Sequence, residues 1–324
     1  IGCRWHSPVS NNYELRGGNL SDFDLEAFTQ LCRQLRELGT AKIILSGQGE
    51  PLLHPRLIEM VKLVKESGFY LKLLTNGTMI DHQLAEALVS TGLDQLQVSL
   101  WASNLREYEL NYPQTDPRFF ERAVTGVRLL NQTRKKQQSR FPKIILHRPI
   151  EKDFYPELGS MIDLALDMGC DALTFSPLKP LGGVDKGKGL QPYEERALAP
   201  ILRDLEKRAQ ACGLETNIPA VLQRYQIGKE VWKSCPCYVS WIDVRIRVNG
   251  DVLACDPCLL VMGHIRQSKH GEIWNSPAFL AVRRAVRTRE GLERMARYCD
   301  CRFCCHVITN LRLYRLFKWF PGLS

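Results

Sequence analysis

The feature that most constrains the fold is a regular alternation of helical and strand-like segments between residues 20 and 218. Helical periodicity over residues 21–37 precedes an apolar run at 42–47, and this succession recurs along the chain with short breaks marked by Gly or Pro. Strands that alternate with helices of about 10–20 residues predict parallel βαβ units with right-handed crossovers.

The pattern predicts an open α/β barrel. The expected strands are 42–47, 70–75, 94–100, 143–147 and 172–175, and the expected helices are 21–37, 55–67, 81–91, 118–137, 157–168 and 193–211. We expect a sixth, leading strand before residue 1, which gives a partial (β/α)6 TIM-like barrel with functional groups on the loops that follow the strands. Periodicity alone is equally compatible with a doubly wound sheet.

A second domain is indicated after residue 218, because eight of the twelve cysteines lie between residues 235 and 305. Residues 241–255 predict a β-hairpin turned at Asn249-Gly250-Asp251, and residues 276–289 predict a helix. The predicted domains are a partial barrel at 1–229 with its first strand missing, a cysteine-rich domain at 230–306, and a basic aromatic tail at 307–324. The tail could pack across the barrel, lie on a membrane surface or engage a partner.

Composition narrows the class of protein. The chain has 324 residues, 44% hydrophobic and 24% charged, which is typical of a soluble globular protein, and no apolar run approaches the roughly 20 residues of a membrane span. The first residues lack signal-peptide features and look cut from a longer sequence, so we expect a cytoplasmic, reducing location in which grouped cysteines bind metals or clusters. The net charge of +9 is spread along the chain, so nucleic acid is an unlikely partner.

The loop after the first complete strand carries a glycine-rich motif, Ser46-Gly-Gln-Gly-Glu-Pro51. Closely spaced glycines let backbone groups approach a ligand. The string resembles the Gly-Gly-Glu-Pro element of radical S-adenosylmethionine (SAM) enzymes, whose backbone holds the amino group of the methionyl moiety. The resemblance implies cofactor contacts from Gly47, Gln48, Gly49, Glu50 and Pro51, with Gln48 standing where glycine is usual.

The resemblance continues at the following strand ends. It implies that Asn76 and Ser99 contact the methionyl carboxylate and the ribose of SAM, although Trp101-Ala102 replaces the Asp-Gly of many relatives. The segment 175–177 is a weak candidate for an adenine contact. His147, on the next expected strand, either faces the cofactor or is a core histidine.

The family's catalytic [4Fe–4S] cluster is bound by three cysteines in the spacing Cys-x3-Cys-x2-Cys. The resemblance implies that Cys3 is the third ligand and that two others lie upstream. It also implies reductive cleavage of SAM to a 5′-deoxyadenosyl radical, with electrons from a reductant such as flavodoxin or ferredoxin. That radical would abstract hydrogen from an unidentified peptide, protein or small metabolite.

The C-terminal cysteines resemble the SPASM and twitch extensions of the same family. Cys237 is followed by Gly250 and then, after four more residues, by Cys255, as at the start of those extensions, and Cys301-x2-Cys304 resembles their closing pair. The implied ligands of one auxiliary [4Fe–4S] cluster are Cys237, Cys255, Cys301 and Cys304. A second cluster that uses the leftover Cys235, Cys258, Cys299 and Cys305 stays open. The alternative hypothesis is a non-catalytic binding or regulatory barrel with a structural zinc held by Cys255, Cys258, Cys301 and Cys304.

Overall fold

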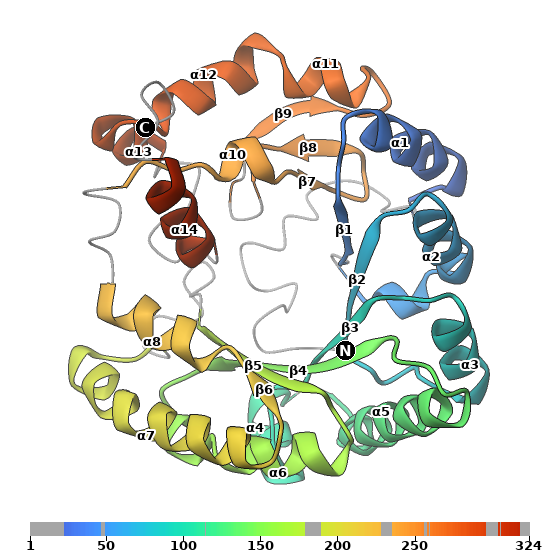
Figure 1. Ribbon diagram of the computed structural model, residues 1–324, viewed down its shortest axis with the longest axis vertical. Helices are drawn as coiled ribbons and strands as arrows, with labels where there is room; N and C mark the ends of the chain where they lie inside the picture. The colour runs from blue at the N-terminus through green and yellow to red at the C-terminus, as the bar shows by residue number, and fades with distance from the viewer. Residues whose placement is uncertain are drawn as a thin grey trace. The chain divides into compact units, whose positions relative to one another are not determined.

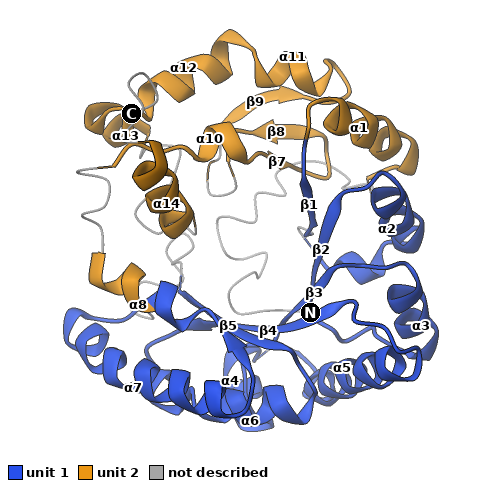
Figure 2. Cartoon of the chain, viewed as in Figure 1, with its two compact units in different colours: residues 1–19, 40–221 blue, residues 20–39, 222–324 orange. Residues whose placement is uncertain are grey.

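A computed structural model describes residues 23–46, 49–113, 115–178, 189–227, 235–255, 258, 260–295, 304 and 306–317. The chain divides into two compact units (Figure 2). As far as they are described, residues 40–221 form unit 1, and residues 20–39 and 222–324 form unit 2.

Unit 1 is built on a parallel sheet whose strands follow one another in chain order. The strands are β1 (Lys42–Leu45), β2 (Tyr70–Thr75), β3 (Gln95–Ser99), β4 (Lys143–Ile150), β5 (Ala172–Pro177) and β6 (Glu215–Thr216). The predicted α/β class with a parallel sheet is confirmed. Strand β6 was not expected, because two residues carry no periodicity that a pattern search can detect.

Helices α2, α3, α5, α6 and α7 line the outer side of this sheet (Figure 1). The helical elements of unit 1 are η1 (Pro51–Leu53), α2 (Leu57–Glu66), α3 (His82–Ser90), α4 (Leu105–Asn111), α5 (Arg118–Lys136), η2 (Tyr155–Glu157), α6 (Ser160–Asp167) and α7 (Pro192–Ala211), while α8 (Ile218–Ile227) spans the division between the units. Helix α3 lies within the predicted helix 81–91. At its N-terminus the Asp81 side chain accepts a hydrogen bond from Leu84 N, and Gly92 follows its C-terminus with φ +69°.

The two faces of the sheet differ in chemistry. Its helix-covered outer face buries Leu71, Leu73, Leu96, Val98, Ile144, Leu146, Leu173 and Phe175. Successive side chains of a strand alternate between faces, and register partners in a parallel sheet share one face. The inner face therefore carries a polar set, Lys72, Gln95, Gln97, Ser99, His147, Thr174 and Ser176, together with the apolar Leu74, Ile145 and Ala172. A polar inner face is expected where a ligand, rather than a hydrophobic core, occupies the middle of a barrel.

Unit 2 contains a small antiparallel sheet in the order β7-β8-β9. Its elements are α1 (Leu25–Glu37), α10 (Val239–Ile242), β7 (Arg245–Ile246), β8 (Asp251–Leu253), β9 (Val261–His264), α11 (His270–Trp274), α12 (Pro277–Ala285), α13 (Arg289–Met295) and α14 (Val307–Phe317). The expected hairpin is present over residues 245–253 and turns at Gly250 with φ +98°, but residues 241–242, which were predicted as strand, belong to α10. Helix α1 belongs to this unit, and Gln34 accepts a 2.7 Å hydrogen bond from the backbone N–H of His270. No helix in the described residues is long and apolar enough to cross a membrane.

Candidate functional site

The loop after β1 is fastened to the end of β2 by the carboxylate of Glu50. Glu50 Oε1 accepts hydrogen bonds from Leu52 N at 3.0 Å and from Thr75 Oγ1 at 2.5 Å. Its Oε2 accepts from Asn76 N at 2.7 Å. Hydrogen bonds to a charged acceptor are about twice as strong as neutral ones, so this single side chain fixes two neighbouring strand ends relative to each other.

The turn after β2 orients the amide of Asn76. Its Oδ1 accepts hydrogen bonds from Thr78 N at 2.9 Å and from Thr78 Oγ1 at 2.7 Å. These two donors identify which atom of the amide is the oxygen, and they hold that oxygen against the turn. Gly77 adopts φ +78°, and a Cβ there would lie 3.2 Å from the Val98 side chain, so glycine suits this position. Within the described residues, Asn76 Nδ2 donates to no partner. A donor at a strand end suits a carboxylate ligand.

Asn76 and Ser99, predicted from separate strand ends, lie together at the same edge of the sheet. Both line a small cavity of about 20 Å³ with Thr78, Leu100, Tyr108, Tyr112 and Ala123. That volume has room for roughly one water molecule and is far too small for SAM. A cofactor at this edge therefore has to contact the two residues from outside the cavity. Gly49 and Pro51 lie beside Glu50 in the same loop, whereas Gly47, Gln48 and Cys3 lie outside the described residues.

His147 lies on the inner face between two hydroxyl groups. Its Nδ1 is 3.1 Å from Thr174 Oγ1, which itself donates to Leu146 O at 3.3 Å, and its Nε2 is 3.3 Å from Ser176 Oγ. This network assigns the ring proton to Nδ1, with Nε2 accepting from Ser176. Burial, and next the positive charge of Lys72, lower the pKa of His147 to about 4. His147 is therefore a neutral, largely buried histidine of the inner face with a hydroxyl partner at each ring nitrogen.

The lowered pKa of His147 predicts a pH-dependent stability. The folded-state pKa lies below the ordinary value of 6.5, so the unfolded chain takes up the proton first as pH falls. The contribution of the neutral His147 to the free energy of unfolding is complete above about pH 6.5 and is lost as the pH falls toward 4. Between pH 7.5 and 5, we expect the free energy of unfolding to fall by on the order of 2 kcal/mol more in the wild type than in His147→Gln. Urea titrations at both pH values measure the difference, and parallel pH profiles would contradict it.

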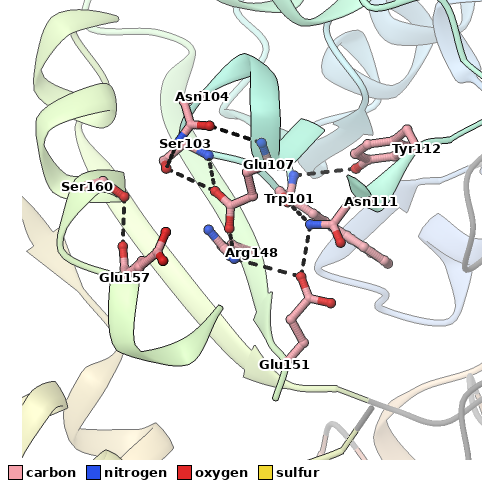
Figure 3. A network of polar contacts seen from close by, with 10 residues as sticks. All are labelled: Trp101, Ser103, Asn104, Glu107, Asn111, Tyr112, Arg148, Glu151, Glu157 and Ser160. Carbon is pink, nitrogen blue, oxygen red and sulfur yellow. Dashed lines mark hydrogen bonds and ion pairs between the residues drawn. The ribbon is translucent and has the colours of Figure 1, made fainter. Parts of the chain in front are cut away.

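Helix α4 is anchored to the outer face of the sheet by a buried ionic network (Figure 3). Arg148 of β4 is fully buried and forms an ion pair with Glu107, while Glu151 Oε1 lies 3.7 Å from its Nη2. The Glu107 carboxylate also accepts from Ser103 N at 2.6 Å and Ser103 Oγ at 2.9 Å. Asn111 completes the network by donating to Glu151 at 2.9 Å and to Trp101 O at 2.6 Å.

This network holds the loop that follows Ser99. The segment 101–104 has its backbone fixed at Trp101 O by Asn111 and at Ser103 N by Glu107. Buried charges of this kind are tolerated only when they are paired and hydrogen-bonded. The network therefore positions a strand end of the candidate site, although neither Arg148 nor Glu107 lies on the inner face. Sequence analysis did not identify it.

The described cysteines of unit 2 fall into two groups. Cys237 and Cys258 are buried in one hydrophobic cluster with Val239, Ala254, Val282, Val286, Leu292 and Met295, and Cys255 packs against it. Cys235 and Cys304 are buried in another cluster with Val307. The structure thus brings together Cys237 and Cys255 of the predicted ligand set, but places Cys304 in the cluster of Cys235. Cys301 lies outside the described residues.

In the second cysteine group, the sulfur atoms of Cys235 and Cys304 each accept an N–H hydrogen bond. Cys235 Sγ accepts from Asn310 Nδ2 at 3.3 Å, and Cys304 Sγ accepts from His306 N at 3.4 Å. Burial raises the pKa of the Cys235 thiol to about 11, and the Asn310 hydrogen bond opposes this shift. N–H donors to sulfur stabilise thiolate ligands of iron–sulfur clusters, so this donor set fits such a cluster.

Asn310 of α14 is the main polar anchor of this group. It is fully buried, accepts from Tyr238 N at 2.5 Å and donates to Pro236 O at 2.6 Å as well as to Cys235. The basic aromatic tail thus begins with a helix that packs on the cysteine segment 235–238. The Phe317 ring also lies 5.6 Å from that of Tyr238.

Replacement of Asn310 should loosen the cysteine segment. In Asn310→Leu, the buried Tyr238 N–H and Pro236 carbonyl lose their partner, which should lower the free energy of unfolding of unit 2 by about 2–4 kcal/mol. We expect faster release of iron to a chelator such as bathophenanthroline under anaerobic conditions. The matched control is Asn275→Leu, since Asn275 is exposed and bonds only its own helix at Gly271 O. Equal iron release from the two variants would refute the anchoring role.

Comparisons with known proteins agree with this arrangement. Residues 4–134 match the radical SAM superfamily, and residues 235–305 match SPASM, an iron–sulfur cluster-binding domain. An AdoMet-dependent heme synthase from Methanosarcina barkeri is 25% identical over 94% of this chain and 85% of its own length. A PqqA peptide cyclase from Streptomyces rochei is 26% identical over 95% of this chain and 84% of its own.

Among solved structures, Streptococcus suis SuiB bound to S-adenosylmethionine matches with a TM-score of 0.61 and 14% identity over 83% of this chain. This chain spans 62% of the length of that SuiB chain, and the likeness shows the fold. The chain thus carries a radical SAM domain and, in its C-terminal part, a SPASM-type iron–sulfur domain. The relatives are named as enzymes, and the two matched domains imply SAM and iron–sulfur clusters as cofactors.

Proposed function

We propose that this chain binds SAM at the edge of the unit 1 sheet and uses it, with a catalytic [4Fe–4S] cluster, to abstract a hydrogen atom from a peptide, protein or small-metabolite substrate. The chemistry that the bound pair supplies is one-electron reductive cleavage of SAM and the hydrogen-abstracting power of the resulting 5′-deoxyadenosyl radical. The electron would come from a reductant such as flavodoxin or ferredoxin. A peptide substrate is supported by the name of the PqqA peptide cyclase relative.

The observation that carries this proposal is the joining of strand ends by Glu50. The carboxylate bonds Thr75 and the backbone of Asn76, which ties the strand end that carries Asn76 to the loop of Gly49 and Pro51. The protein's own part is to bind the methionyl carboxylate and amino group of SAM through Asn76 and residues 47–51, and its ribose through Ser99. Cys3 is proposed as one ligand of the catalytic cluster.

In unit 2 we propose at least one auxiliary [4Fe–4S] cluster, with Cys237 and Cys255 as ligands from the predicted set that lie in one group, whereas Cys304 of that set lies in the group of Cys235. The division of the described cysteines into two groups supports a second position that includes Cys235. Iron and sulfide analysis of the anaerobically purified full-length protein separates these cases. About eight irons per chain correspond to one auxiliary cluster and about twelve to two.

The test of the whole proposal is SAM cleavage. The reconstituted protein, incubated anaerobically with SAM and dithionite, should form 5′-deoxyadenosine and methionine, detected by liquid chromatography and mass spectrometry. A protein that contains zinc and no iron, and that leaves SAM intact, would overturn it in favour of a non-catalytic barrel.

A further inference from the structure

Lys72 is an ammonium group on the inner face that has no acidic partner among the residues the structure describes. It lies on β2 in register with Gln95, and its side chain is partly buried. Within the described residues, no carboxylate lies within ion-pairing distance of its Nζ. By contrast, Lys143 on the same face is paired with Glu215 at 2.5 Å, and Lys65 outside the inner face is paired with Asp94. A half-buried lysine without a counter-ion is uncommon, because burial penalises the charged form.

A second lysine increases this imbalance. Lys42 of β1 projects to the same face, and its Nζ lies 5.3 Å from the Tyr70 ring centroid. Burial, and next the charge of Lys42, lower the pKa of Lys72 to about 8. Two like charges held on one concave face cost free energy unless an anion lies near them. Perturbed groups of this kind concentrate at functional sites.

Apart from Lys72, Lys42 and the Lys143–Glu215 ion pair, the described residues of the inner face are neutral, and they include both hydrogen-bonding groups and apolar side chains such as Leu74 and Ile145. On β3, Gln95 and Gln97 are the register partners of Lys72 and Leu74. On the next two strands, the neutral His147 of β4 is the register partner of Thr174 of β5, and Ser176 lies two residues further along β5. Glu215 is the one acid on the inner face of the described strands, and Lys143 neutralises it. Among the described residues of this face, no carboxylate therefore balances the positive charge of Lys72 and Lys42.

We propose that the inner face of unit 1 binds a carboxylate of the substrate, with the Lys72 ammonium as its main contact and Lys42 beside it. This inference rests on the proposed function, because it takes the inner face as the side toward which the substrate lies. The carboxylate can belong to an acidic peptide side chain or to a small organic acid, which share the same recognition chemistry.

Competitive acetylation of the anaerobic, cluster-loaded protein tests the site. Trace acetic anhydride at pH 8 is applied with glutarate, with its neutral diamide glutaramide, or with sodium chloride at matched ionic strength, and labelled peptides are quantified by mass spectrometry. A bound carboxylate that raises the pKa of Lys72 by about one unit should slow its acetylation about five-fold, since only the neutral amine reacts. Lys143, already paired, and the exposed Lys62 are internal controls. The expected result is slowing by glutarate and not by glutaramide that is largest at Lys72 and absent at Lys143 and Lys62.

Two outcomes overturn the proposal. One is a Lys72 acetylation rate that glutarate leaves unchanged or that glutaramide lowers equally. The other is a loss of SAM affinity of about ten-fold or more in Lys72→Met relative to Lys143→Met, measured by equilibrium dialysis, because Lys72 would then contact the cofactor's own carboxylate. The labelling does not require SAM cleavage. Protection by glutarate in a protein that leaves SAM intact would therefore refute the proposed function and retain the anion site.

Discussion

Replacing Arg148 with methionine should lower the free energy of unfolding by about 3–5 kcal/mol, because two carboxylates would remain buried without their cation. Arg148 is fully buried, and the side chains of Glu107 and Glu151 are only 2% and 1% exposed. Methionine fills much of the space but supplies no charge, so the carboxylates must take up protons or admit water. We expect the largest loss of protection in segment 99–111, measured by hydrogen–deuterium exchange together with urea unfolding.

Two companion variants make this result specific. Arg118→Met removes an ion pair with Asp116 in which the arginine side chain is 86% exposed, and it should change the free energy of unfolding by less than about 1 kcal/mol. The double variant Glu107→Gln/Arg148→Met removes one of the stranded charges and should be more stable than Arg148→Met alone. If Arg148→Met and Arg118→Met lose equal stability, the buried network does not anchor α4.

The network also shows where local sequence patterns stop being informative. Arg148 stands in the apolar run 143–150 of β4, where a strand pattern indicates burial but gives no reason for an arginine. The reason is Glu107, 41 positions earlier on a short helix that the pattern did not predict. Periodicity reports which face of one element is apolar, whereas an ion pair between two elements depends on the fold. The βα succession could thus be predicted, and the network could not.

Contacts between residues far apart in sequence were also beyond prediction in unit 2 and at the candidate SAM site. Residues 21–37 could be predicted as a helix, yet its packing on α11 depends on a contact 236 positions away, between Gln34 and His270. The motif at 46–51 and the cysteine spacing predict candidate sites from the sequence because their residues are contiguous or closely spaced. The function of Glu50 was predicted only as a cofactor contact. Its bonds to Thr75 and Asn76, across 25 and 26 positions, show that it also sets the geometry of the neighbouring strand end.

The second large effect is expected at Glu50. Glu50→Gln keeps the shape of the side chain, and one amide oxygen can still accept from Leu52 N and Thr75 Oγ1. The amide –NH2 group would then face the Asn76 N–H, so a donor meets a donor where a carboxylate oxygen now accepts at 2.7 Å. A conflict of this kind costs about 1–3 kcal/mol. If the turn that holds Asn76 shifts in response, SAM affinity should fall about ten- to hundred-fold in equilibrium dialysis of the cluster-loaded protein.

The control for this prediction is Glu59→Gln on α2, where the carboxylate pairs with Arg56 and both side chains are 53% exposed. That variant should bind SAM with wild-type affinity. Thermal unfolding of both variants separates a local effect from loss of the fold, because one altered hydrogen bond should leave most of the unit 1 sheet intact. Wild-type SAM affinity in Glu50→Gln would mean that the strand ends keep their geometry without the carboxylate. In that case Asn76 would be oriented by its own turn through Thr78 and Gly77, and Glu50 would serve the loop after β1 alone.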